Sequence, residues 1–246
     1  MSEPRPQGSG GYYPSRDLSP RQAGVDRKGA GRQPCNARIK AAAMKLLLTG
    51  FGPYGAVEVN PSEQVVRRIA ERAQRRGSDD LITEILPTEF VSAGQRIRSL
   101  IRKFRPAAVL CLGVAPKRDK ISLERAALNL DDEALPDNAG RVRKGRQIVR
   151  GGPVAYWSTL PLERIRKRLE KRGIPVSYSN HAGTYLCNHV FYIACHEMQR
   201  KGHRSRCGFV HVPPLRQRGK KAQPRGLPLG KMVEAVECCL EVLRKR

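Results

Sequence analysis

The sequence predicts an α/β fold, a single three-layer domain in which helices cover both faces of a mostly parallel, twisted central sheet. Two observations lead to this prediction. Between residues 44 and 246, short apolar runs typical of buried strands alternate with segments whose apolar residues recur at helical spacing. The same span shows no internal repeat and no linker, so we expect one domain, long enough to bury a core without disulfides.

The first expected strand is 45–49, an apolar run followed by glycine. A helix then begins, because Asn60 is a favoured N-cap residue, Pro61 suits the first helical position and Glu63 the third. The apolar face of this helix consists of Val65, Val66, Ile69 and Ala70. Alternating apolar and polar residues over 81–86 predict the next strand.

A second helix follows, because its apolar residues fall at the i, i+3, i+4 and i+7 positions of one helical face. They are Ile97, Leu100, Ile101 and Phe104. The apolar run 107–114 predicts another strand. A third helix is expected to open at Pro161 and to close at Gly173, with an apolar face made by Leu162, Ile165 and Leu169.

The remaining elements continue the alternation of strand and helix. A strand is expected at 176–179, a helix at 186–200 and a strand at 209–212. The last helix is marked by the apolar residues Val236, Cys239, Leu240 and Leu243. The outer faces of these helices carry many cations, a pattern that is usual for a solvated surface; examples are Arg164, Arg166, Lys167, Arg168, Lys171 and Arg172.

Residues 1–43 are a different kind of chain, rich in Gly, Pro, Ser, Gln and Arg and without apolar periodicity. Such a composition buries too little apolar surface to offset chain entropy, so we expect a disordered, basic N-terminal extension. Met44 stands directly before the first expected strand and is the alternative start of the protein. The folded domain is therefore expected over residues 44–246.

The charge of the chain is strongly positive, with 47 Lys and Arg against 22 Asp and Glu, a net +25. The extension accounts for only +5 of this excess. Such a charge invites a nucleic-acid partner. However, only 5% of the residues are aromatic and the cations lie along many helices, which disfavours a base-stacking platform and makes nucleic acid an unexpected partner. No apolar stretch approaches the length of a membrane span, so no membrane partner is expected.

The seven cysteines show no paired spacing, and no signal peptide precedes them. Reduced thiols in the cytoplasm are the simplest interpretation. Cys195, His196, His203 and Cys207 are an alternative set of metal ligands, but their spacing matches no zinc pattern. We expect neither a metal nor an organic cofactor.

Three residues carry chemistry near the ends of expected strands. Cys187 begins a helix, where the positive end of the macrodipole is expected to lower its pKa and favour the nucleophilic thiolate. His211 ends an apolar strand before two prolines, a suitable place for a general base. Glu124 lies among apolar residues and needs a partner, and a histidine that it orients is the natural one. The alternatives are a buried structural cysteine, a hydrogen-bonded core histidine and a salt-bridged glutamate.

Together, Cys187, His211 and Glu124 form a chemically complete triad for nucleophilic acyl transfer. Six ordered motifs surround them: Leu48-Thr49-Gly50-Phe51-Gly52-Pro53-Tyr54-Gly55, Val59-Asn60-Pro61, Ile121-Ser122-Leu123-Glu124-Arg125, Pro136-Asp137-Asn138, Ala182-Gly183-Thr184-Tyr185-Leu186-Cys187-Asn188 and Gly208-Phe209-Val210-His211-Val212-Pro213. Through these motifs the sequence resembles the pyroglutamyl-peptidase type I family, also called pyrrolidone-carboxylate peptidases. The resemblance covers most of residues 44–217.

The resemblance implies a cysteine peptidase that removes N-terminal pyroglutamate from peptides through a thioester. It implies Cys187 as nucleophile, His211 as base and Glu124 as the residue that orients the base. It also implies that Phe51 and Tyr54 line the lactam pocket, although the family usually has Phe at the second position. A neutral lactam fits such an apolar slot with a few polar anchors. Asn60 is a candidate anchor, and its N-cap role explains it equally well.

Two departures from the family pattern set the remaining questions. The family usually has an Arg where this chain has Ala134, which opens the alternative of a catalytically weakened member. The stretch 214–226 is unusually basic, and the resemblance implies that this region forms the substrate entrance or subunit contacts in a homo-oligomer. A polyanion-binding or RNA-binding module on the same scaffold is the alternative from another functional class.

Overall fold

The computed structural model describes residues 44–55, 57–200, 206–216 and 226–245. The strands in these residues are β1 (Leu46–Phe51), β2 (Leu81–Leu86), β3 (Ala108–Val114), β4 (Ile121–Leu128), β5 (Asp131–Glu133), β6 (Arg143–Arg146), β7 (Ala155–Trp157), β8 (Val176–His181) and β9 (Arg206–Val212). The helices are α1 (Pro61–Arg75), α2 (Phe90–Phe104), α3 (Leu162–Lys171), α4 (Leu186–Gln199) and α5 (Leu229–Arg244). The expected extension, 1–43, lies outside the described residues.

A seven-stranded sheet forms the middle layer in the order β2-β1-β3-β9-β4-β7, and the seventh strand, β8, pairs with the other edge of β4. The pairs β1–β2, β1–β3, β3–β9 and β4–β8 are parallel, whereas β4 is antiparallel to both β9 and β7. Each central strand is buried on both faces, which explains the continuous apolar runs that identified them. The mostly parallel α/β fold is therefore confirmed.

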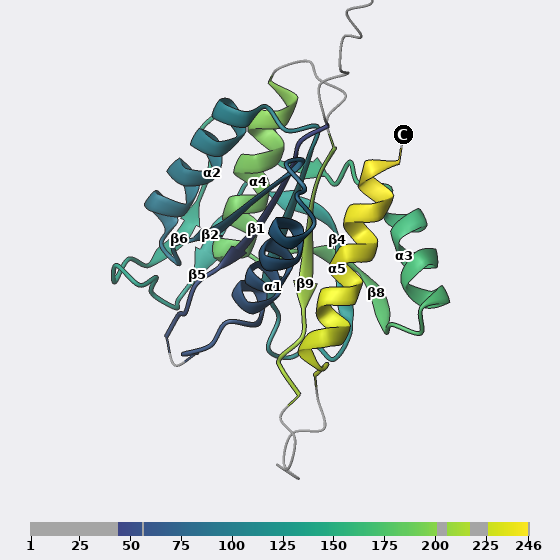
Figure 1. The fold of residues 1–246 in the computed structure, drawn as a ribbon. Coiled ribbons are helices and arrows are strands. Elements are labelled where there is room, and N and C mark those ends of the chain that lie inside the picture. The colour runs from purple at the N-terminus through teal and green to yellow at the C-terminus, as the bar shows by residue number, and fades with distance from the viewer. Residues whose placement is uncertain (1–43, 56, 201–205, 217–225, 246) are drawn as a thin grey trace, which may run out of the picture. The chain divides into compact units, whose positions relative to one another are not determined.

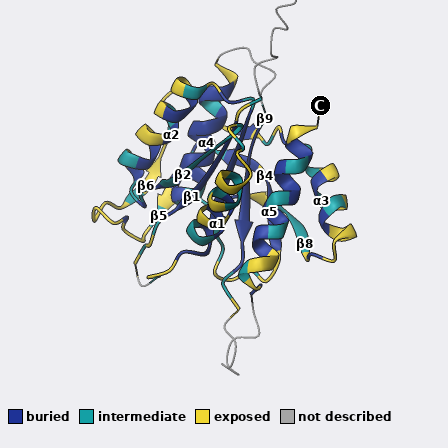
Figure 2. Cartoon of the chain, viewed as in Figure 1, coloured by how far each residue is buried: buried dark blue, intermediate teal, exposed yellow. Residues whose placement is uncertain are grey.

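The helices form the two outer layers (Figure 1). Apolar side chains of α1, α3 and α5 make one buried cluster with the sheet, and those of α2 and α4 make another on the opposite face. Figure 2 shows the buried sides of the helices turned toward the sheet and their exposed sides turned to solvent. None of the helices in the described part of the chain is long and apolar enough to cross a membrane.

Helix boundaries follow the local signals. Asn60 caps α1, its side-chain oxygen accepting from the Ser62 N–H at 3.0 Å, and Pro61 takes the first helical position as predicted. Pro161 is the N-cap of α3 rather than its first residue. Gly173 follows α3 at φ +62°, a left-handed conformation that glycine adopts without steric cost and that ends the helix.

Two features of the sheet departed from the sequence prediction. Strand β4, which carries Glu124 near its middle and runs antiparallel to β9, was not among the predicted strands. The short strands β5, β6 and β7 were not predicted, because residues 131–133 and 143–146 are polar and carry no apolar alternation. The β5–β6 hairpin is nevertheless important for the site, since residues around it line the cavity described next.

Candidate active site

A cavity of about 390 Å³ opens where β1, β3 and β9 end and α4 begins. Five of the six predicted site residues line it: Phe51, Tyr54, Asn60, Cys187 and His211. The sixth, Glu124, is fully buried beside it and contacts His211. The fold therefore brings together residues that are more than 150 positions apart in sequence. The cavity size is within the ordinary range for small-ligand sites.

His211 is oriented by a buried carboxylate. Its Nδ1 lies 2.7 Å from Oε1 of Glu124, and both side chains are almost fully buried. The same carboxylate oxygen accepts a hydrogen bond of 2.6 Å from Arg118, whose other terminal nitrogen donates to the Ser179 hydroxyl at 3.0 Å. A carboxylate held in this way fixes a proton on Nδ1 of His211 and leaves Nε2 free to accept one.

The charge balance around Glu124 keeps it ionised. Burial by itself would raise the pKa of Glu124, but the hydrogen bond and charge of His211, with contributions from Ser179 and Arg118, bring that pKa below its ordinary value. Arg118 was not singled out from the sequence, because it lies in a loop whose only signal was its Pro and charged residues. The structure makes it the cation that balances the buried carboxylate.

Cys187 occupies the second position of α4, and Tyr185 is the N-cap of that helix. The macrodipole was expected to lower the thiol pKa. Instead, burial, followed by the negative charge of Glu124 and the neighbouring Cys111, raises the pKa of Cys187 to about 12. The thiol is therefore protonated at neutral pH, and a base must remove its proton before it can attack.

The residues after Cys187 hold α4 in place. The Asn188 side chain accepts from the Leu128 N–H at 2.8 Å and donates to the carbonyls of Leu128 and Leu130. Nδ1 of His189 lies 2.8 Å from Asp131, which also accepts from Arg143 at 2.7 Å. These buried contacts fasten the start of α4 to β4 and to the β5–β6 hairpin. Sequence reasoning missed the cluster because its members are far apart in the chain.

Phe51, Tyr54 and Asn60 shape one side of the cavity. Phe51 ends β1 and is almost fully buried. Burial, with the nearby Cys187, raises the pKa of Tyr54, so its hydroxyl stays neutral. Asn60 lines the cavity and caps α1, and its amide also donates to the Gly52 carbonyl at 2.9 Å. The N-cap role of Asn60 is therefore confirmed, and its role as a substrate anchor stays a prediction.

The Pro136-Asp137-Asn138 segment fixes the loop above the cavity. The Tyr185 hydroxyl donates to the Pro136 carbonyl at 2.9 Å, and the Asn138 amide donates to the Pro53 carbonyl at 2.9 Å. A carboxylate oxygen of Asp137 accepts a hydrogen bond of 2.9 Å from the N–H group of Phe90, the first residue of α2. Asp137 thus caps this helix although it lies far from it in the sequence. Ala134 is exposed in this loop.

Of the alternative metal set, Cys195, His196 and Cys207 lie in the described residues, and these three are not grouped as metal ligands. Cys195 and Cys207 are buried, and Nδ1 of His196 lies 2.8 Å from the Tyr156 hydroxyl. His203 lies outside the described residues, as do Arg218, Lys220 and Lys221 of the basic stretch. In the described ranges, no three His, Cys, Asp or Glu side chains are grouped as metal ligands would be.

Gly113 gives a first prediction. It is the register partner of His211 on β3, and a Cβ built there would lie 2.7 Å from Sγ of Cys187 and 2.8 Å from the Phe209 ring. We expect Gly113→Ala to displace the thiol and to lower kcat by about 100-fold, with about 1–3 kcal/mol of lost stability. The measurement is steady-state kinetics beside thermal unfolding. Gly230→Ala, where a Cβ meets nothing within 4 Å, is the control. Unchanged kcat in Gly113→Ala would contradict this packing.

Comparisons of the sequence and of the structure with known proteins all point to one family of peptidases. A sequence model described as pyroglutamyl peptidase matches residues 44–246. The pyrrolidone-carboxylate peptidase of Bacillus cereus is 37% identical over 199 residues, covering 80% of this chain and 91% of that protein. The Pyrococcus furiosus protein of the same name is 37% identical over 204 residues, covering 81% and 97%. The crystal structure of Bacillus amyloliquefaciens pyroglutamyl peptidase I superposes with a TM-score of 0.76 at 35% identity, covering 82% of this chain and 98% of that one.

Proposed function

The chain belongs to the pyroglutamyl peptidase family of hydrolases, and we propose that it removes N-terminal pyroglutamate from peptides with a Cys187–His211–Glu124 triad. The observation that carries the proposal is the pairing of His211 with buried Glu124 at 2.7 Å, in the cavity that Cys187 also lines. A thiol, an imidazole and an orienting carboxylate are the parts that nucleophilic acyl transfer requires.

The pyroglutamyl ring binds first, in the cavity beside Phe51 and Tyr54. The ring is a neutral lactam, so the free-energy cost of moving it out of water is small if its amide finds hydrogen-bonding partners in the cavity. Tyr54 and Tyr185 suit this role, because burial raises both phenol pKa values, that of Tyr185 to about 12, and keeps the cavity wall uncharged. Asn60 contributes its remaining amide hydrogen.

Acylation follows. Nε2 of His211 removes the Cys187 proton as Sγ forms a bond to the pyroglutamyl carbonyl carbon. The first hydrogen bond within α4 runs from the His189 N–H to the Tyr185 carbonyl, so the Leu186 and Cys187 N–H groups precede the helical ladder. These N–H groups receive the oxyanion. His211, now an imidazolium stabilised by Glu124, gives its proton to the departing amine as the C–N bond breaks and the thioester forms.

Deacylation uses the same groups. Nε2 of His211 takes a proton from water as the water oxygen attacks the thioester carbonyl. The C–S bond breaks, the Cys187 sulfur is reprotonated by His211, and free pyroglutamate leaves. No step requires a group beyond the side chains, backbone N–H groups and water.

Three further expectations stay predictions: the formation of a homo-oligomer, the cytoplasmic location, and the division of the chain into an extension (1–43) and a folded domain (44–246).

The raised thiol pKa gives a prediction about alkylation. A thiol with a pKa of about 12 is almost wholly protonated below that pH, and its reactive thiolate fraction grows as the pH rises. We expect alkylation of Cys187 by iodoacetamide to accelerate about tenfold per pH unit between about pH 7 and about pH 9. Peptide mapping after timed quenching measures it. A rate that is already constant above about pH 6 would instead indicate a preformed thiolate–imidazolium pair.

Substrate discrimination tests the proposed activity. Purified protein is assayed with pyroglutamyl-arylamide and with prolyl-arylamide, which differ in the ring carbonyl and in the charge of the ring nitrogen. The cationic proline ring would be buried without an anionic partner, so we expect its kcat/KM to be lower by more than about 100-fold. Equal hydrolysis of both compounds, or of neither, would contradict the proposed function.

A further inference from the structure

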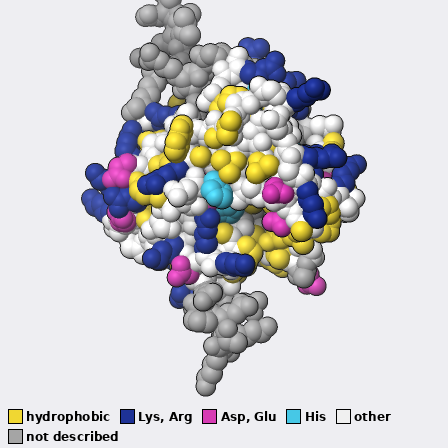
Figure 3. All heavy atoms as spheres, turned by 180° about the vertical axis from the view of Figure 1, so that it is seen from behind, with side chains coloured by type: hydrophobic (Ala, Val, Ile, Leu, Met, Phe, Trp, Pro, Cys, Tyr) yellow, Lys and Arg dark blue, Asp and Glu magenta, His cyan; other side chains and the backbone are white. Residues whose placement is uncertain are grey.

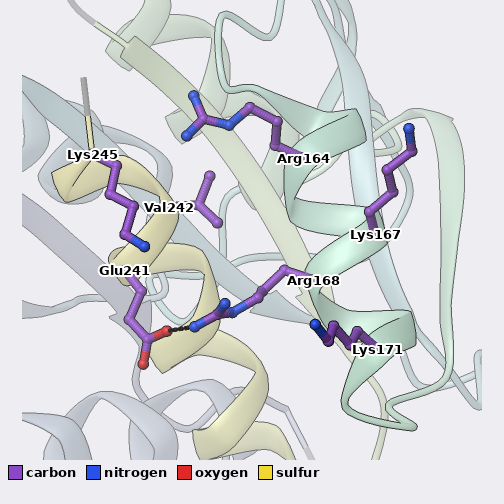
Figure 4. Close-up of a pocket in the computed structure, with 7 residues that line it drawn as sticks. All are labelled: Arg164, Lys167, Arg168, Lys171, Glu241, Val242 and Lys245. Atoms are coloured by element: carbon purple, nitrogen blue, oxygen red, sulfur yellow. Dashed lines mark hydrogen bonds and ion pairs between the residues drawn. The ribbon is translucent and has the colours of Figure 1, made fainter.

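A second cavity, separate from the candidate active site, lies between α3 and α5 (Figure 4). It has a volume of about 310 Å³ and shares no lining residue with the active-site cavity. Its charged lining residues are Arg164, Lys167, Arg168, Lys171, Glu241 and Lys245. Five cations therefore surround one carboxylate. Four of the cations come from α3, and Lys245 follows the end of α5.

Charges on α3 are segregated by side, which a merely solvated helix does not require. Its two acidic residues, Glu163 and Glu170, do not line the groove, and both pair with Arg166, which does not line it either. The side toward α5 carries Arg164, Arg168 and Lys171 and no acidic residue, and Lys167 lines the edge of the groove (Figure 4). Positions 164, 168 and 171 follow i, i+4, i+7 spacing, which places them on one helical face.

Most of the cations in the groove lack anionic partners. Arg168 pairs with Glu241 at 2.6 Å, and Lys167 lies 3.6 Å from Glu163, whose carboxylate is already engaged by Arg166. No carboxylate among the described residues pairs with Arg164, Lys171 or Lys245. In addition, Nε of Arg168 is buried without a hydrogen-bond partner. Like charges held together in this way repel one another unless an anion joins them.

We propose that the α3–α5 groove binds the phosphodiester backbone of single-stranded nucleic acid. Arg164 and Lys171 are seven residues apart, about 10 Å along the helix, which spans a few successive phosphates of one strand. No aromatic residue lines the groove, so the phosphates are bound and the bases are not read. The low aromatic content that argued against a base-stacking platform is therefore no obstacle here.

The concentration of cations in the groove differs from their arrangement elsewhere. Seen from behind, the molecule shows hydrophobic side chains near its middle, with Lys, Arg and a few carboxylates around them (Figure 3). The net charge of +25 would attract polyanions to the whole surface, but the groove is where unpaired cations converge on a concave site. An anionic peptide or membrane is less suited, because regularly spaced single charges are a property of the phosphate backbone.

The test is binding of fluorescein-labelled oligouridine and oligothymidine to the full chain, followed by anisotropy over a salt series. The logarithm of the affinity is expected to fall linearly with the logarithm of salt, equally for both strands. In the double variant Arg164→Gln/Lys171→Gln, two phosphate contacts are lost. We expect the slope to become shallower by about 1.4 and the affinity at about 0.1 M salt to fall at least about tenfold.

The matched control is Arg68→Gln/Arg75→Gln on the exposed face of α1, which removes the same charge at the same spacing. It is expected to keep most of the affinity, and thermal unfolding midpoints verify that both variants fold. An equal loss of affinity in the two double variants would show that binding depends only on the net charge of the protein, and it would overturn the proposal. Absence of wild-type binding at about 50 mM salt would also overturn it, whatever the outcome of the peptidase assays.

Discussion

Replacing Cys187 with Ala is expected to abolish hydrolysis of pyroglutamyl-arylamide, lowering kcat by at least about 10⁴-fold. The methyl group of alanine cannot form the thioester, and no neighbouring side chain supplies another nucleophile in that position. Cys111, although close, is fully buried, and burial together with Cys207 strongly raises its pKa. The thermal unfolding midpoint should change little, because the thiol is half-buried at the cavity wall.

Cys195→Ala is the matched control, since Cys195 lies on the same helix and is a buried free thiol away from the cavity. We expect that variant to lose some stability by creating a small void and to retain its kcat. Activity in Cys187→Ala within about tenfold of the wild-type value would exclude Cys187 as the nucleophile.

Substituting Gln for Glu124 is expected to have the second-largest effect, a fall in kcat of about 10²–10⁴-fold. The amide would present an N–H group to Nδ1 of His211, which then favours the tautomer with its proton on Nε2. An imidazole in that tautomer cannot accept the thiol proton. The kinetic signature is a loss in kcat with little change in KM, because Glu124 does not line the substrate cavity.

Glu197→Gln provides the control for this substitution. Glu197 is also a buried carboxylate and accepts hydrogen bonds from Arg98 and Arg102, but it lies near the end of α4, remote from Cys187. It should lose stability as Glu124→Gln does, while its kcat stays near the wild-type value. If both variants lost activity in proportion to their stability, Glu124 would have a structural role only.

The sequence was sufficient to single out the residues that the fold brings to the cavity or beside it. Cys187, His211 and Glu124 were recognisable because each is an unusual residue in an apolar context, and the helix start at Asn60 because capping is a local property. What the sequence could not supply is spatial convergence. The reversal of β4, the pairing of Arg118 with Glu124 and the approach of Gly113 to the thiol all depend on contacts between distant segments.

The thiol pKa shows where local reasoning fails. The helix start was identified correctly, and its macrodipole does favour a thiolate. However, that contribution is modest, whereas burial of the sulfur and the nearby Glu124 carboxylate act in the opposite direction and prevail. The balance depends on how deeply the residue is buried and which charges surround it, neither of which is a property of the helix alone.

Ala134, where the resemblance implies an arginine, is the basis of the alternative of a catalytically weakened family member. It is exposed in the loop above the cavity, and the contacts among His211, Glu124 and Arg118 form without any side chain from this position. A weakened family member would therefore differ in substrate positioning and not in the assembly of the base. Such a defect would appear as a raised KM with the thiol chemistry retained.

The most direct test of the central claim is to follow pyroglutamyl-arylamide hydrolysis during progressive alkylation with iodoacetamide, while peptide mapping measures the modified fraction at each cysteine. Cys187 borders the cavity, whereas the other cysteines in the described residues are buried. We predict that activity falls in direct proportion to the unmodified fraction of Cys187 and is protected by free pyroglutamate. Full activity in protein whose Cys187 is completely alkylated would contradict the account.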